Sequence, residues 1–143
     1  MSASTCMEAV PQLEQPAAPI RVLTVGVGDS DHGELSWLLR EPECNLYRAS
    51  ARRDAASLVR RHSPNVVLCE PSLADGTWQD LLADLEGQAR RPMLIVCSLL
   101  ADDRLWAEVL NIGGYDVLMK PFRPVEVTRV VRMAARQAEW RRD

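Results

Sequence analysis

The chain has 143 residues, of which 47% are hydrophobic, with a formal net charge of −3 at pH 7 and a pI near 5.4. This length is typical of one domain with a substantial core. The acidic balance gives no general attraction to nucleic acid or to an anionic membrane, so we expect neither as a partner. The four cysteines lack metal-ligand spacing, and no signal peptide or membrane span is apparent, which predicts a cytoplasmic protein with reduced thiols.

Residues 1–19 lack periodicity and are rich in Ala, Pro, Gln and Ser, which predicts a disordered tail before a domain over residues 20–143. In that domain short β-like runs alternate with helical patterns. The predicted strands cover residues 22–27, 45–49, 65–69, 93–97 and 117–119. The predicted helices cover residues 31–40, 52–61, 77–86, 102–112 and 124–140. Five such pairs indicate an α/β fold with a doubly wound, five-stranded parallel sheet and five helices.

Helix-capping signals support this division of the chain. Asp31 precedes Glu34 by three residues, and Thr77 precedes Asp80 by three, which is the spacing of a capping box. Pro124 suits the first turn of the last helix, because the N–H group that proline lacks would have no hydrogen-bond partner within the helix there. We therefore expect helices to begin next to these residues.

Two ionisable residues directly follow predicted strands. Glu70 comes after the apolar run 65–69, and Lys120 comes after the run 117–119. The carboxyl ends of parallel strands meet at one edge of the sheet, and open α/β sheets form their sites there. We therefore expect Glu70 and Lys120 to share one crevice, with an ion pair that is direct or bridged by one water.

This arrangement resembles the receiver domains of response regulators over residues 21 to about 136. The motifs that carry the resemblance are Glu70, the Leu-Ala-Asp-Gly loop at 73–76, and the block Gly-Gly-Tyr-Asp-Val-Leu-Met-Lys-Pro-Phe at 113–122. The resemblance implies a flavodoxin-like fold with strand order 2-1-3-4-5. It also implies a phosphoacceptor position at Glu70, the family's lysine at Lys120, and a cis peptide bond before Pro121.

The chain departs from the family at its metal and phosphoacceptor positions. Receivers hold Mg²⁺ with an acidic pair, and the corresponding positions here are Gly26 and Val27. Asp29 and Asp31 are weak replacements, because Mg²⁺ tolerates little displacement of its ligands; their ordinary roles are a turn residue and a helix N-cap. Glu70 is one methylene longer than Asp, and misplacement by about 1 Å can cost on the order of 10²-fold in rate. We expect no cofactor, no Mg²⁺ and no enzymatic activity.

The positions that transmit phosphorylation in the family also differ. The switch hydroxyl aligns with Cys97, whose thiol is a weak hydrogen-bond donor; Ser98 would take the role only in a register shifted by one. The aromatic switch aligns with Val117, which has no ring, although Tyr115 could point the same way from two residues earlier. We therefore expect weak coupling between the site and the surface.

Receivers use their fourth helix, fifth strand and fifth helix as a partner surface. The candidate contacts on it are Trp106, Tyr115, Arg129 and Arg132, although a helical Trp is more often core and an arginine row is usually a solvated face.

We predict a stand-alone, atypical receiver that binds proteins independently of phosphorylation in two-component-type signalling. Its expected partners are a kinase, an output protein or a second copy in a homodimer. The alternative is a receiver that is phosphorylated on Glu70 or on a displaced Asp. The Glu70–Lys120 pair has two possible roles: it imitates a phosphorylated aspartate for signalling, or it only stabilises the structure.

Overall fold

A computed structural model of the chain describes residues 19–40 and 44–142, so the predicted tail lies outside the described residues except for its last position. A parallel five-stranded sheet forms the centre of the described part, in the order β2-β1-β3-β6-β7. The strands are β1 (Ile20–Val25), β2 (Cys44–Ala49), β3 (Val66–Cys69), β6 (Met93–Ser98) and β7 (Asp116–Met119). In chain order this is the predicted 2-1-3-4-5 arrangement, which is confirmed.

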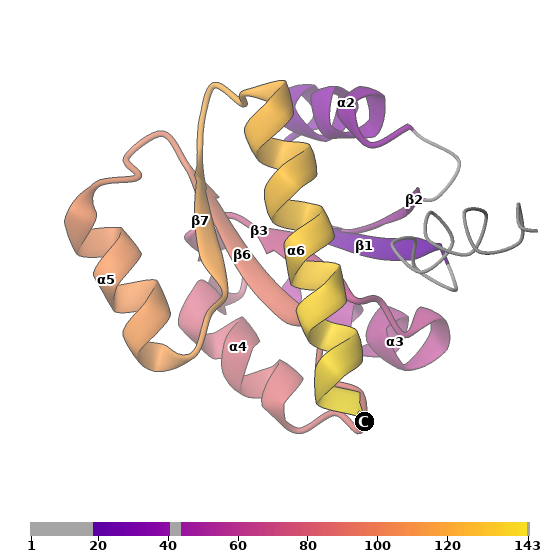
Figure 1. Ribbon diagram of the computed structural model, residues 1–143. Coiled ribbons are helices and arrows are strands. Elements are labelled where there is room, and N and C mark those ends of the chain that lie inside the picture. The colour runs from indigo at the N-terminus through magenta and orange to yellow at the C-terminus, as the bar shows by residue number, and fades with distance from the viewer. Residues whose placement is uncertain (1–18, 41–43, 143) are drawn as a thin grey trace, which may run out of the picture.

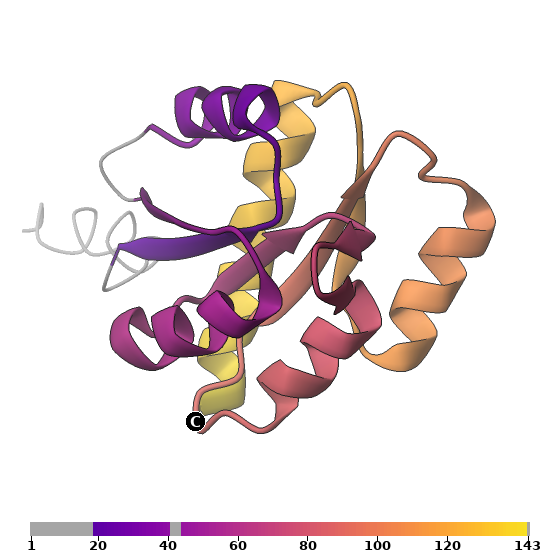
Figure 2. The ribbon, with the colours of Figure 1, turned by 180° about the vertical axis from the view of Figure 1, so that it is seen from behind.

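Helices cover both faces of the sheet. The described helices are α2 (Asp29–Leu38), α3 (Arg52–His62), α4 (Trp78–Glu86), α5 (Asp103–Ile112) and α6 (Pro124–Arg142). Helices α2 and α6 pack on one face of the sheet, and α3, α4 and α5 pack on the other. Figure 1 shows α6 crossing in front of the sheet, and Figure 2 shows the molecule from behind. The doubly wound α/β fold predicted from the sequence is therefore confirmed.

Strand alternation divides the core into two apolar clusters. Leu68, Ile95 and Leu118 point toward α2 and α6, whereas Val67 and Leu94 point toward α3, α4 and α5. All five side chains are at most 1% exposed. Each such side chain contributes about 1.5–3 kcal/mol when fully buried. Burial on both faces explains why the central strands are unbroken apolar runs in the sequence.

The junction between β1 and α2 differs from the prediction. Gly26 has φ +69°, in the left-handed region, and β1 ends just before it, two residues earlier than expected. Helix α2 then begins at Asp29, and its N-cap is Gly28 without a side-chain cap. The predicted capping role of Asp31 is therefore wrong, because Asp31 lies inside the first turn of the helix. Asp29 is likewise a helical residue and not the expected turn residue.

The predicted start of α4 is confirmed in detail. Thr77 Oγ1 accepts a hydrogen bond from the Asp80 N–H at 3.3 Å, and Asp80 Oδ2 accepts one from the Thr77 N–H at 3.0 Å. These reciprocal bonds are the capping box expected from the spacing. Pro124 begins α6, also as predicted.

A small hairpin that the sequence did not predict follows β3. It pairs β4 (Ser72–Leu73) with β5 (Gly76–Thr77), and its tip residue Asp75 binds the start of α3. The Asp75 carboxylate accepts hydrogen bonds from the N–H groups of Arg52 (2.9 Å) and Arg53 (3.2 Å). These bonds, the Arg52 bond foremost, lower the pKa of Asp75. The hairpin is thereby attached to the N-terminus of α3, where a negative charge is favourable.

Candidate functional site at the carboxyl edge of the sheet

Lys120 binds two carboxylates at the carboxyl edge of the sheet. Its Nζ atom donates hydrogen bonds to Glu70 Oε2 at 2.6 Å and to Asp31 Oδ2 at 2.8 Å. The exposed fractions are 12% for the Lys120 side chain, 21% for Glu70 and 31% for Asp31. The predicted direct pair of Glu70 and Lys120 is confirmed, and so is the cis peptide bond before Pro121. We call Asp31, Glu70 and Lys120 the lysine cluster.

Opposing effects act on the charge of Lys120. Burial lowers its pKa, but the hydrogen bonds to Asp31 and Glu70, together with their negative charges, outweigh burial and raise the pKa above 10.5. A neighbouring anion stabilises the charged form of an amine. The ammonium group is therefore charged at neutral pH.

The surroundings of Gly26 are a poor fit to the Mg²⁺ ion that the family implies. A Cβ atom at Gly26 would lie 2.6 Å from Leu73 Cδ2, so the hairpin's leucine fills the space beside this position. Asp29 forms an ion pair with Arg48 at 2.5 Å, apart from the lysine cluster to which Asp31 belongs. Within residues 19–40 and 44–142, no three His, Cys, Asp or Glu side chains gather as metal ligands. Octahedral Mg²⁺ needs several oxygen ligands in near-ideal geometry.

Both candidate switch residues in β6 lie near the lysine cluster, since the charges of its members act on the Cys97 thiol and the Ser98 carbonyl oxygen accepts a hydrogen bond from the Lys120 N–H at 3.0 Å. Burial raises the pKa of the Cys97 thiol, Glu70 and Asp31 raise it further, and Lys120 lowers it. The Ser98 hydroxyl instead accepts a hydrogen bond from the Leu100 N–H at 3.0 Å, in the turn after the strand. The position aligned with the family's switch hydroxyl therefore carries a buried thiol, while the Ser98 hydroxyl serves the turn.

Val117 and Tyr115 do not point the same way. Val117 packs against the cluster under α3, α4 and α5, whereas Tyr115 packs against the cluster under α2 and α6. The expectation that they would be equivalent is wrong, because β7 begins only at Asp116 and strand alternation does not extend to Tyr115. Burial and Asp116 raise the pKa of Tyr115, while Arg129 lowers it.

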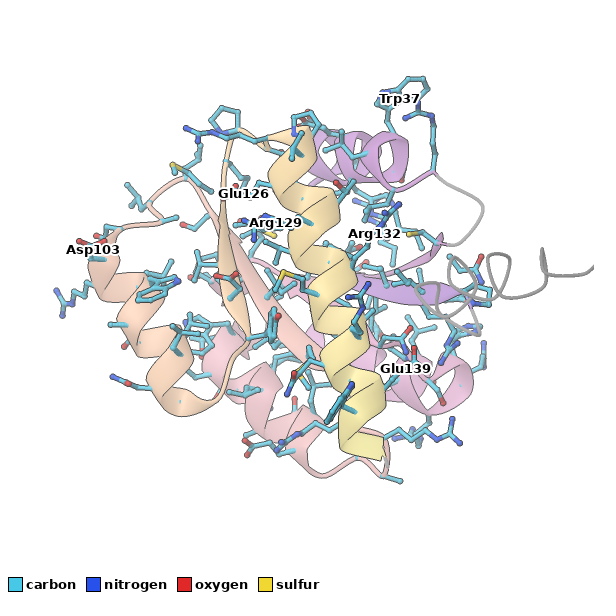
Figure 3. The ribbon with its side chains drawn as sticks, viewed as in Figure 1. Trp37, Asp103, Glu126, Arg129, Arg132 and Glu139 are labelled. Carbon is cyan, nitrogen blue, oxygen red and sulfur yellow. The ribbon has the colours of Figure 1, made fainter. Side chains whose placement is uncertain are left out.

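Three of the predicted interface residues line one groove. The groove has a volume of about 270 Å³ and lies between α5, β7 and α6; its walls are Trp106, Leu110, Tyr115, Asp116, Arg129, Val130 and Met133. The Trp106 residue is 50% exposed, so it is not the core residue that helical aromatics usually are. Arg132 lies on the other side of α6 from Arg129 in Figure 3, so it does not share the groove.

Sequence reasoning missed the contact between Asp31 and Lys120. A signal for it was present, because β1 and β3 are neighbours in the predicted order and the segment after β1 opens at the same edge as Glu70. What hid the contact was the assignment of Asp31 as a helix cap. Once α2 begins at Asp29, the side chain is available to Lys120.

Solved structures share this fold at low identity. The receiver domain of an HD domain-containing protein from Pseudomonas fluorescens is 22% identical, with a TM-score of 0.78, and the match covers 90% of this chain and 95% of that one. The beryllofluoride-activated NtrC4 receiver domain dimer is 20% identical, with a TM-score of 0.74 and coverage of 82% and 98%. CheY of Borrelia burgdorferi, solved with CheX, BeF₃ and Mg²⁺, is 18% identical, with a TM-score of 0.71, and the match covers 81% of this chain and 89% of that one. Likeness at this identity establishes the fold alone.

The family follows from the sequence match. No curated protein matches the chain. No helix in the described part of the chain is long and apolar enough to cross a membrane, and the cytoplasmic location stays a prediction. The family model of the response regulator receiver domain matches residues 30–132, which is most of the chain. The chain therefore belongs to the response regulator receiver domain family.

Proposed function

We propose that this receiver domain acts in two-component-type signalling through protein contacts that do not require phosphorylation. The observation that carries the proposal is the lysine cluster, in which Lys120 Nζ already holds two carboxylates at 2.6 and 2.8 Å. The resemblance to receiver domains implies that this lysine points into the phosphorylation site of the family. Here Glu70 supplies a permanent negative charge at that place, as a partial imitation of a phosphorylated residue, although a carboxylate has fewer charges and oxygens than a phosphoryl group.

The surroundings of Glu70 also disfavour phosphoryl transfer. The reaction depends on alignment of the attacking atom and on cations that neutralise the developing charge. The extra methylene of Glu70 moves its carboxylate, and Leu73 fills the space beside Gly26 where the family's acidic pair begins. We therefore propose that the domain binds no Mg²⁺ and has no catalytic role.

The groove beside Trp106 supports a protein partner, and we propose a second copy of the chain as one of them. Two-fold dimers bring the same surface together, so each anchor residue is used twice. The groove holds both Asp116 and Arg129, which allows opposite charges to meet across such an axis. The NtrC4 receiver forms a dimer and Borrelia CheY was solved with CheX, so related folds bind both like and unlike partners.

The second candidate function is phosphorylation of a displaced acid. Asp31 favours it, because this aspartate lies 2.8 Å from Lys120 and is more exposed than Glu70. Asp31 has the shorter side chain that the family uses as phosphoacceptor.

Incubation with acetyl phosphate and Mg²⁺, followed by intact-mass measurement, separates the two candidates. We expect no added phosphoryl group on the unaltered chain. A phosphoryl adduct that disappears in Asp31→Asn but persists in Glu70→Gln would establish the second candidate. An adduct that disappears only in Glu70→Gln would show that Glu70 itself is the phosphoacceptor, and either result would overturn the proposal.

A further inference from the structure

A second pocket lies on the other side of Trp106. It has a volume of about 350 Å³, and its walls are Ala101, Asp102, Asp103, Trp106, Val117, Met119 and Glu126. Figure 3 shows Asp103 at the start of α5 and Glu126 at the start of α6, with β7 between the two helices. We call this the acidic pocket. Trp106 is the residue that it shares with the groove described above.

The charges of the acidic pocket have one sign. It is lined by three carboxylates, and none of its lining residues is basic. Asp102 has a structural role, because it is the N-cap of α5 and its side chain accepts a hydrogen bond from the Leu105 N–H at 2.9 Å. Asp103 lies in the first turn of the same helix, where acids are favourable.

Glu126 likewise lies in the first turn of its helix, α6, but one oxygen of its carboxylate lacks a hydrogen-bond partner among the described residues. This atom, Oε1, is buried. A buried acceptor without a donor destabilises the folded chain, and more so when it is charged. A positively charged donor that entered the acidic pocket would relieve this cost, because the carboxylate would gain both a hydrogen bond and a counter-charge.

Two large, exposed apolar side chains lie in the pocket beside the acids. Trp106 is 50% exposed and Met119 is 42% exposed, and both line the pocket. Leu99 and Leu100, which are 72% and 79% exposed, directly precede the lining residue Ala101. Clustered apolar side chains with a charged rim are typical of protein-interaction sites.

We propose that the acidic pocket binds a basic, apolar segment of a partner protein, in which Lys or Arg stands between large apolar side chains. The basic group points to Glu126 and Asp103, and the apolar side chains pack on Trp106 and Met119. The inference rests on the proposed function, since it names the chemistry of one partner. It assigns the acidic pocket to an unlike protein, while the groove with Arg129 on the other side of Trp106 serves the second copy.

A pair of peptides tests the proposal on the full chain. The probe is an amphipathic helical peptide of Leu and Lys, and its comparison is the same peptide with Glu in place of Lys. Binding is measured by calorimetry at low and high salt. We expect the Leu/Lys peptide to bind with a salt-dependent affinity and the Leu/Glu peptide not to bind. Failure of the Leu/Lys peptide to bind would overturn the proposal.

Two chain variants localise the binding. Glu126→Gln should weaken the Leu/Lys peptide about tenfold, which is 1.4 kcal/mol. Glu34→Gln makes the same charge change at an exposed position of α2 and should leave the affinity unchanged. The melting temperature of Glu126→Gln should not fall, because the substitution keeps the size of the side chain and breaks no hydrogen bond of the Oε1 atom. Equal weakening in both variants would show general charge attraction and overturn the proposal.

Two further outcomes separate this inference from others. If Glu126→Gln weakens self-association in ultracentrifugation and the Leu/Lys peptide does not bind, the acidic pocket belongs to a homodimer and the proposal is wrong. A phosphoryl adduct in the mass measurement would overturn the proposed function without any change in peptide binding, so the two failures are distinguishable.

Discussion

The lysine cluster and the surface of α5, β7 and α6 differ in whether their charged side chains have hydrogen-bond partners within the chain. Within the lysine cluster, Lys120 is hydrogen-bonded to both carboxylates. On the helical surface Trp106 is half-exposed, and Glu126 Oε1 has no partner among the described residues. At the place where the family has its chemistry, the ammonium group is held by two carboxylates, whereas the surface where receivers meet proteins keeps an acceptor without a partner in the described part of the chain. This difference supports the proposal that the domain acts through protein contacts.

The two regions also differ in how they are enclosed. The hairpin after Glu70 is attached to α3 through Asp75, and its Leu73 packs beside Gly26. The Arg52 side chain adds hydrogen bonds to the Asp75 carbonyl oxygen at 2.9 Å and to Asp84 Oδ2 at 2.9 Å. By contrast, Trp106 lines two separate hollows in the surface of α5, β7 and α6. Substitutions should therefore affect folding in the first region and binding in the second.

Lys120→Ala should have the largest effect on the free energy of unfolding. It leaves the carboxylates of Glu70 and Asp31 partly buried without their cation. We expect a loss of about 2 kcal/mol, between the ~0–1 kcal/mol of an exposed pair and the ~3–5 kcal/mol of a fully buried one. Urea denaturation measures this loss.

The control for Lys120→Ala is Arg48→Ala, because the partner of Arg48, Asp29, has a side chain that is 95% exposed. Arg48→Ala should lower the free energy of unfolding by less than about 1 kcal/mol. The pKa of Lys120 is raised above 10.5, so its contribution should be complete below that pH and should be lost only as the pH rises through the raised value. Equal losses in the two variants would remove the distinction between the lysine cluster and an ordinary surface pair.

Gly26→Asp, which restores an acid of the family, should destabilise the chain by about 1 kcal/mol. The positive φ is costly for a residue with a Cβ, and that atom would approach Leu73 Cδ2 to 2.6 Å. Gly28→Asp is the matched control, since this N-cap has φ −65° and open space, and Asp is a favoured N-cap residue. Thermal melting should therefore separate the two variants. A stable Gly26→Asp variant that binds Mg²⁺ would contradict the account of Leu73.

Trp106→Ala should change the free energy of unfolding by less than about 1 kcal/mol, because half of the residue is already exposed. It should weaken a homodimer about tenfold or more if Trp106 is an anchor in the groove. Trp37→Ala removes an indole that is 64% exposed on α2 and should leave self-association unchanged. Analytical ultracentrifugation at micromolar concentration measures both, and a monomer at every concentration would refute the dimer.

The smallest expected effect concerns His32, whose Nδ1 lies 3.0 Å from Thr24 Oγ1. Burial and Arg48 lower its pKa, and Asp29 raises it to a lesser extent. The unfolded chain therefore takes up this proton more readily, so stability should fall slightly as the pH drops below 6.5. His32→Gln should flatten the slope of melting temperature against pH between about pH 5 and pH 7. An unchanged slope would show that other groups are responsible.

The strand order came from the resemblance to receiver domains, whereas the amino-acid sequence by itself determined the alternation of strands and helices, the two-sided core and the pairing of Glu70 with Lys120. These features depend on short-range periodicity and on the rule that parallel strands end at one edge. The capping box at Thr77 was also local, because its two partners lie three residues apart. Such features need no knowledge of distant contacts.

Only the tertiary structure decided which other side chains complete each site. Asp31 meets Lys120 because the chain turns at Gly26 and begins α2 at Asp29, and no periodic pattern encodes that turn. Leu73 reaches Gly26 through a hairpin of two-residue strands, which is too short to leave a strand signal. The unpartnered oxygen of Glu126 depends on how α6 packs beside α5 and β7. Contacts between loops and helix ends join residues far apart in the chain, and the spacing of a sequence describes only neighbours.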